Sequence, residues 1–272
     1  MKLTKSFITL LLAGLAFNAQ AHKPWLLPSS TVLDEKEAWV TVDAAISEGL
    51  FDIDHQPLKL DGVVVTGPDG APVAFENVNL GKLRNTFDLK LAKPGTYKIS
   101  LVTQNVAGSY TIDGASKRFR APEDGYAKEI PAGAQDVVIS HQYNRLETFV
   151  TSGAPTQTVL KPSGVGLELL PLTHPNDMRA GDQARWRFLV DGKPAAHLAF
   201  SLIPGGVRYR GTLGEIRQST DAIGEISFAL PAPGMYMVSA ATPAMTPPVD
   251  GKPAPLPARR MSYAATVEVL PQ

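Results

Sequence analysis

Short runs of β-branched and aromatic residues, separated by glycine, proline and aspartate, recur along the chain. Clear examples lie at residues 39–42, 62–66, 97–102 and 136–139. Frequent proline residues between such runs leave little room for helices of ordinary length. Runs of this length, closely spaced and bounded by turn residues, are typical of β-sandwiches. The sequence therefore predicts an all-β fold.

An internal repeat indicates how the strands are divided. The segment KPGTYKIS at 93–100 matches APGMYMVS at 232–239, and upstream the Asp-Gly-x-Pro at 69–72 matches that at 191–194. Asp-Gly is typical of hairpin turns, and Pro-Gly-x-Tyr opens a late strand in both copies. The repeat predicts two immunoglobulin-like β-sandwich domains. We place the N-terminal domain at residues 22–155 and the C-terminal domain at residues 156–272.

Residues 1–21 have the pattern of a secretory signal peptide. Lys2 and Lys5 precede an apolar run at 7–17, and Ala19-Gln20-Ala21 supplies a small-x-small cleavage pattern. The apolar run is shorter than the about 20 residues that a membrane-spanning helix needs. We therefore expect cleavage after Ala21, export to the bacterial periplasm, and a mature chain that begins at His22 and does not span the membrane.

Charge and cysteine content exclude several classes of protein. The 26 Lys and Arg residues balance the 26 Asp and Glu residues, so the basic excess typical of nucleic-acid binding is missing. Cysteine is absent from the sequence, which excludes thiolate zinc sites, iron–sulfur clusters and cysteine nucleophiles. The sequence also contains no Gly-x-Ser-x-Gly, P-loop or His-Glu-x-x-His motif. We therefore expect a protein that is not an enzyme and has no nucleic-acid partner.

The expected mature terminus, His22-Lys23-Pro24, offers two nitrogen ligands from one residue. The α-amine and the ring Nδ1 of an N-terminal histidine can chelate one ion, and an α-amino group, with a pKa of about 8, loses its proton at modest cost. Pro24 has no N–H, so further ligands must come from side chains rather than from successive backbone nitrogens. This arrangement is a histidine brace, which suits copper, nickel or cobalt. A frayed terminus without a metal is the alternative.

Two other segments offer ligands. A glycine and a proline flank Asp54 and His55, which favours a loop that presents a carboxylate and an imidazole together. A histidine bonded only within its own turn is the alternative there. His174 follows an apolar strand, where a structural role competes with a ligand role. We expect His141 to be a partly buried residue, and His197 to lie on the outer face of a strand.

Several segments together resemble one family. They are AHKPWLLPS at 21–29, WVTVDAA at 39–45, FDIDH at 51–55, RLETFVT at 145–151, GLEL at 166–169 and HPND at 174–177. They are similar to an exported bacterial family of unknown function, often labelled as the periplasmic component of cobalt- or nickel-type transport systems. The resemblance covers essentially the whole mature chain. It implies a metal-related accessory protein, with His22 and His55 as candidate ligands and His174 as a third.

The second half of the chain has a resemblance of its own. The segments at 191–194, 219–224 and 233–236 are similar to the Cna-B/transthyretin-like sandwich family. This implies that the C-terminal domain is an immunoglobulin/Cna-B-like β-sandwich.

Together, these features predict a periplasmic accessory protein for the uptake or homeostasis of nickel, cobalt, copper or iron. His22 and His55 would bind a divalent ion, with Asp54 and His174 as further candidates, because nitrogen and oxygen ligands suit divalent late transition metals. The expected partner is an inner-membrane transporter or a reductase that receives the metal. Two alternatives stay open: a copper-brace redox enzyme, and an adaptor or envelope interaction module that binds no metal.

Overall fold

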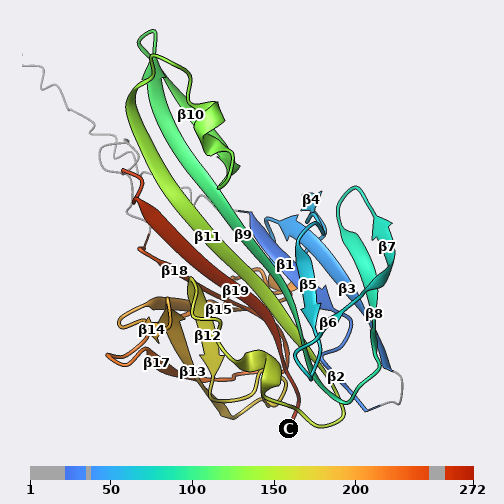
Figure 1. The fold of residues 1–272 in the computed structure, drawn as a ribbon. Helices are drawn as coiled ribbons and strands as arrows, with labels where there is room; N and C mark the ends of the chain where they lie inside the picture. Colours follow the sequence, from blue (N-terminus) through green and yellow to red (C-terminus); the bar gives the residue numbers. More distant parts are fainter. Residues whose placement is uncertain (1–21, 35–37, 245–254) are drawn as a thin grey trace, which may run out of the picture.

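The structure, a computed structural model, describes residues 22–34, 38–244 and 255–272 (Figure 1). The expected signal peptide at 1–21 therefore lies outside the described residues. The regular structure is nearly all β, which confirms the all-β prediction. The described helices are single turns: α1 (Val207–Arg210) and the 3-10 turns η1 (Tyr126–Glu129) and η2 (Thr158–Leu160). Among the described residues no helix has the length and apolar character needed to cross a bilayer.

The strands form three sheets, which we call the first, the large and the third sheet. In spatial order the first sheet contains β1 (Lys23–Pro28), β3 (Ala38–Ser47), β8 (Asn85–Leu91) and β7 (Glu76–Leu80), with β4 (Gln56–Pro57) beside β3. The third sheet contains β12 (Leu167–Pro171), β13 (Gln183–Val190) and β14 (Lys193–Pro194), with β17 (Glu225–Ala229) beside β13.

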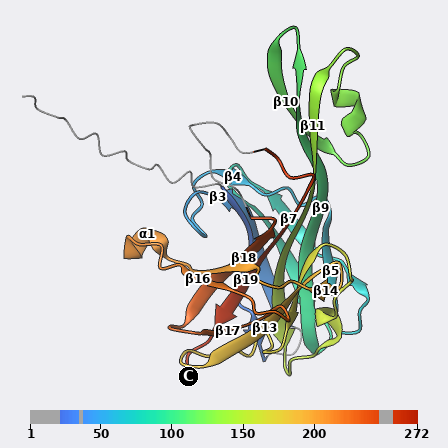
Figure 2. The same ribbon diagram turned by 90° about the vertical axis from the view of Figure 1, so that its left-hand side faces the viewer.

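The large sheet has ten strands and joins both halves of the chain. Its order is β16 (Ile216–Ser219), β15 (Ala199–Pro204), β18 (Gly234–Thr242), β19 (Arg259–Val269), β11 (Gln135–Ser152), β9 (Gly95–Ile112), β5 (Val63–Thr66) and β6 (Pro72–Val73), with β10 (Ala115–Pro122) beside β9 and β2 (Val32–Leu33) beside β11. The far ends of β9 and β11, with β10, project from the body as an arm (Figures 1 and 2).

The two smaller sheets pack on opposite faces of the large sheet. One core, built from residues 26–150, lies between the first sheet and β5, β9 and β11, and it includes Phe87, Tyr97 and Val150. The other, built from residues 167–269, lies between the third sheet and β15, β18 and β19, and it includes Trp186 and Tyr263. Successive side chains of a strand point to opposite faces, so alternate residues of the shared strands supply the two cores.

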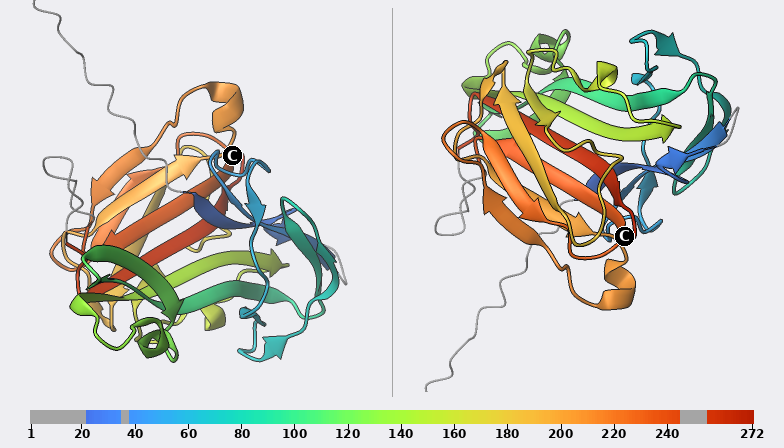
Figure 3. Two further views of the ribbon diagram at one scale, coloured as in Figure 1. Left: turned by 90° about the horizontal axis from the view of Figure 1, so that it is seen from above. Right: turned by 90° about the horizontal axis from the view of Figure 1, so that it is seen from below.

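The large sheet is continuous across the expected domain boundary. That boundary, at residues 155 and 156, lies in the loop between the end of β11 and η2. However, β11 pairs in parallel with β19 from His141↔Arg259 to Thr148↔Thr266, so strands from both expected domains lie side by side (Figure 3). The division of the chain into two separate domains stays a prediction.

The internal repeat appears in the structure as a pair of equivalent contacts. The hydroxyl of Tyr97 donates a hydrogen bond to the backbone oxygen of Lys93, and the hydroxyl of Tyr236 donates one to that of Ala232, both at 2.8 Å. Each tyrosine is buried near the start of its strand and reaches back four residues. This is the tyrosine-corner arrangement of immunoglobulin-like sandwiches, so it explains why Pro-Gly-x-Tyr occurs twice.

A buried ionic cluster joins the two halves of the chain through β11 and β12. Arg145 on β11 lies 3.3 Å from a carboxylate oxygen of Glu147 and 3.3 Å from one of Glu168 on β12. Tyr263 on β19 donates a hydrogen bond to Glu147 at 3.0 Å. All three charged side chains are at most 7% exposed, so each depends on the others for its charge to be tolerated in the interior.

Candidate metal centre

Pairing between β1 and β3 places His22 beside the turn that follows β3. The strands are antiparallel, with Lys23 opposite Ser47 and Pro28 opposite Val42. His22 immediately precedes β1, and the residues after Ser47 form the turn. The carboxylate of Asp54 closes this turn, since its two oxygens accept hydrogen bonds from the backbone N–H groups of Glu48 and Gly49, each at 3.1 Å.

Trp25 holds the start of β1 against the body of the protein. Its side chain is fully buried, and its Nε1 donates a hydrogen bond to Ser47 Oγ at 2.7 Å. Its ring meets that of Phe51 edge to face, with centroids 5.7 Å apart. The same small core contains Ile203 and Met237 from the large sheet. The backbone from Lys23 onward is therefore fixed in a sheet.

This geometry brings His22 and His55 together. Their rings are stacked, with centroids 3.8 Å apart and an angle of 15° between the ring planes. Nε2 of His22 also lies 3.3 Å from a carboxylate oxygen of Glu48. All three residues are exposed. An imidazole pair with a neighbouring carboxylate thus occupies the surface where the sequence predicts the N-terminal site.

The stacked pair does not yet have the orientation that a shared ion needs. Nitrogen ligands lie about 2.0–2.1 Å from a transition-metal ion, so two that share one ion lie roughly 3–4 Å apart. In stacked rings the nitrogen lone pairs lie in two nearly parallel planes, so one ring must turn before a nitrogen of each can bind the same ion. Exposed side chains change rotamer readily. Within the described ranges no group of three or more His, Asp or Glu side chains has the arrangement of a metal site.

The other candidate ligands have different surroundings. Asp54 lies in the same turn, but both of its oxygens bond backbone N–H groups, so it supports the turn that carries His55. His174 is buried. Its Nε2 lies 3.1 Å from Thr96 Oγ1 and 3.1 Å from the backbone oxygen of Thr156, and its Nδ1 accepts a hydrogen bond from the N–H of Asn176.

His174 is distant from the histidine pair. Its neighbour Thr96 bonds Thr151, whose N–H donates to the backbone oxygen of Thr31, just beyond the C-terminal end of β1. His22 lies at the other end of that strand. The pKa of His174 is lowered, because burial lowers it more than the hydrogen bond with Thr156 and the charge of Asp177 raise it. A buried imidazole with both nitrogens bonded has the surroundings of a structural residue.

The two histidines that we did not take as ligands also lie elsewhere. His141 is on the arm, where its Nδ1 is 2.7 Å from a carboxylate oxygen of Glu123. His197 is exposed, but it lies in the turn before β15 with a φ of 56° rather than on the face of a strand, as alternation predicted. The residue that sequence reasoning missed is Glu48, because only the pairing of β1 with β3 brings its carboxylate to His22.

Comparison with protein-family models gives one family. The family described as "Domain of unknown function (DUF4198)" matches residues 19–244. No curated protein matches the chain.

Solved structures are similar at low identity. The D0-D1 domain of intimin is 12% identical, with 90% of this chain and 97% of that one covered, at a TM-score of 0.22. The human OSCAR ligand-binding domain is 15% identical, with 91% and 99% covered, at the same TM-score of 0.22. Trypsin-activated alpha-2-macroglobulin from Escherichia coli is 12% identical at a TM-score of 0.22, and the match covers 90% of this chain but 16% of that one. Likenesses at this level carry no argument about function.

Proposed function

The chain belongs to the DUF4198 family of unknown function, and we propose that it is a periplasmic accessory protein that binds a divalent transition-metal ion through His22 and His55. The periplasmic location is part of the proposal and rests on the signal-peptide pattern at residues 1–21. The transfer of the ion to an inner-membrane transporter or a reductase is also part of the proposal.

One observation carries the proposal: two histidines on separate segments have stacked rings with centroids 3.8 Å apart. His22 is the residue that cleavage after Ala21 would free, and it immediately precedes β1, the strand anchored by the buried Trp25. An anchored strand holds its first ligand in place, so binding an ion costs less conformational entropy than it would at a frayed end.

Glu48 supports the chelate that the proposal requires. When Nε2 of His22 carries the proton and donates to Glu48, Nδ1 keeps its lone pair. Nδ1 is the ring nitrogen that can close a chelate with the α-amine of the same residue. A carboxylate that receives the other ring N–H also raises the basicity of a ligating imidazole. Glu48 therefore favours the tautomer that binds the metal.

The donor set indicates which ions fit. His22 would supply an amine and an imidazole nitrogen, and His55 a second imidazole, with carboxylates of Glu48 and Asp54 nearby. Nitrogen-rich, thiolate-free ligation suits Cu(II), Ni(II) and Co(II), with copper bound most tightly.

Calorimetric titration of the mature chain with Cu(II), Ni(II) and Co(II) tests the proposal. We expect one ion to bind per chain. For the ion that binds most tightly, we expect His55→Ala to weaken the affinity at least about 10-fold, a change of about 1.4 kcal/mol in binding free energy. The matched control is His197→Ala, which removes an exposed histidine outside the site and should bind like the unaltered chain. Equal affinity of the His55→Ala variant and the control would refute the assignment.

A further inference from the structure

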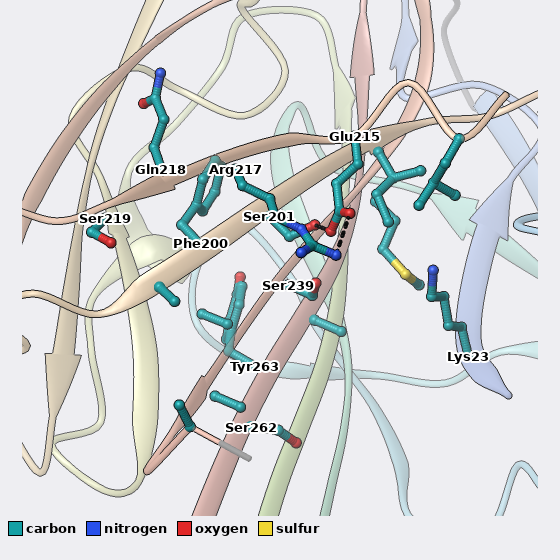
Figure 4. A pocket seen from close by; sticks show the side chains of 18 of the residues that line it. Lys23, Phe200, Ser201, Glu215, Arg217, Gln218, Ser219, Ser239, Ser262 and Tyr263 are labelled. Carbon is teal, nitrogen blue, oxygen red and sulfur yellow. Dashed lines mark hydrogen bonds and ion pairs between the residues drawn. The ribbon is translucent and has the colours of Figure 1, made fainter. Parts of the chain in front are cut away.

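An open cleft of about 1040 Å³ begins at His22 and extends over the large sheet (Figure 4). Its floor includes Ser201 of β15, Ser239 of β18 and Ala264 of β19, which are successive register partners and therefore share one face. That is the face on which the first sheet packs, because Ala264 also contacts the core beneath the first sheet. The cleft is thus the part of this face that the first sheet leaves open.

The charged side chains that line the cleft are mostly cationic. Among the described residues they are Lys23, Arg217 and Arg260, against the single carboxylate of Glu215, besides His22. Glu215 lies 2.7 Å from a guanidinium nitrogen of Arg217 and accepts a hydrogen bond from Ser201 at 2.5 Å. One cation is therefore balanced, and two positive charges remain at the cleft, although the chain as a whole has equal numbers of cationic and anionic residues.

Lys23 contributes one of the unbalanced charges. It lies on β1 and lines the cleft. In Figure 4 its side chain is drawn apart from the ion pair of Glu215 and Arg217. An anion in this part of the cleft would pair with the ammonium group of Lys23.

Arg260 contributes the other charge. Burial lowers the pKa of its guanidinium group, and its Nε is buried without a hydrogen-bond partner in the described part of the chain. A buried guanidinium nitrogen without an acceptor costs free energy that an oxyanion ligand would recover. The guanidinium is also the side chain whose geometry best matches carboxylate and phosphate oxygens.

We infer that this cleft binds a small organic anion whose carboxylate or phosphate oxygens contact Arg260 and Lys23. The volume of about 1040 Å³ lies just above the usual range for small-molecule sites and far exceeds what an inorganic ion needs. Serine hydroxyls on the floor can bond further polar groups, and Ala264 allows close approach. The cleft adjoins the metal centre at His22, but neither Arg260 nor Lys23 is a proposed metal ligand.

Calorimetric titration of metal-free mature protein at low ionic strength, with citrate and glucose 6-phosphate as probes, tests the inference. We expect a Kd below about 1 mM for at least one probe. Binding of citrate alone identifies carboxylate, and binding of glucose 6-phosphate alone identifies phosphate as the recognised group. Failure of both probes to bind would overturn the inference.

Variants assign the binding to the cleft. We expect Arg260→Gln to weaken the bound probe at least about 10-fold, the effect of removing one charge-assisted hydrogen bond, and Lys23→Gln to weaken it as well. Arg118→Gln, on the exposed strand β10 of the arm, is the matched control and should bind like the unaltered chain, as should His55→Ala. Equal binding by Arg260→Gln and the control would contradict the inference, whatever the outcome at the metal centre. Melting curves of all variants verify that they are folded.

Discussion

The imidazole ring of His22 lies stacked on that of His55, with centroids 3.8 Å apart and an interplanar angle of 15°. One ring lies at the start of β1 and the other in the loop after β3, so the contact depends on the pairing of these strands.

Glu48 acts as a positioning residue for His22. Replacing it by glutamine should lower the affinity for Cu(II) about 10-fold. The neutral amide accepts the hydrogen bond from Nε2 of His22 more weakly than the carboxylate does. Nitrogen-15 NMR of the His22 ring should show a smaller population with the proton on Nε2. The control is Glu76→Gln on the exposed edge strand β7, and an unchanged tautomer population in Glu48→Gln would show that the contact has no such role.

Trp25 should be a major determinant of stability. Trp25→Ala removes a fully buried ring and the hydrogen bond to Ser47, which should lower the free energy of unfolding by about 3–5 kcal/mol. The matched control is Trp39→Ala: this side chain is 45% exposed and packs with Lys90, so about 1 kcal/mol or less is expected. Urea denaturation measures both, and similar losses in the two variants would contradict the described anchoring of β1.

The ionic cluster between the two halves should be intolerant of partial removal. Arg145→Ala leaves Glu147 and Glu168 buried without their cation, so we expect a loss of about 3–5 kcal/mol in the free energy of unfolding. Arg118→Ala on the arm should change it by no more than about 0.5 kcal/mol. Denaturation at neutral pH distinguishes these values. A loss below about 1 kcal/mol for Arg145→Ala would mean that the carboxylates are not buried as described.

His174 should make stability depend on pH. Its pKa in the folded protein is lowered, chiefly by burial, whereas in the unfolded chain it is about 6.5. Below that value the unfolded state binds more protons than the folded state, so the free energy of unfolding should fall as the pH drops from about 6.5 toward the folded pKa. The difference in unfolding free energy between the unaltered chain and His174→Gln should therefore shrink between pH 7.5 and pH 5.5. A constant difference would refute the assignment.

Local patterns predicted much of the fold because they report on single strands and turns. The β-branched run at 39–42 lies in β3, where buried and exposed residues alternate, and the two Pro-Gly-x-Tyr segments open β9 and β18. The loop around His55 was also predicted, from the flanking glycine and proline. These features depend on neighbouring residues alone.

Contacts between distant segments account for what the sequence did not reveal. The parallel pairing of β11 with β19 joins strands about 120 residues apart in the chain and places the two halves of the chain in one sheet. Glu48 reaches His22 through the register of β1 and β3, and Arg260 faces the cleft because of its position on β19. No local spacing encodes these relationships, since they follow from the order of strands in the sheets.

Titration of two forms of the mature chain with Cu(II) tests the central claim most directly. One form begins at His22 and the other carries one additional glycine before it, which moves the free amine away from the ring and leaves every side chain unchanged. We predict that the additional residue weakens binding at least about 10-fold, because the chelate between the amine and Nδ1 of His22 is lost. Equal affinity of the two forms would contradict metal binding through the mature terminus.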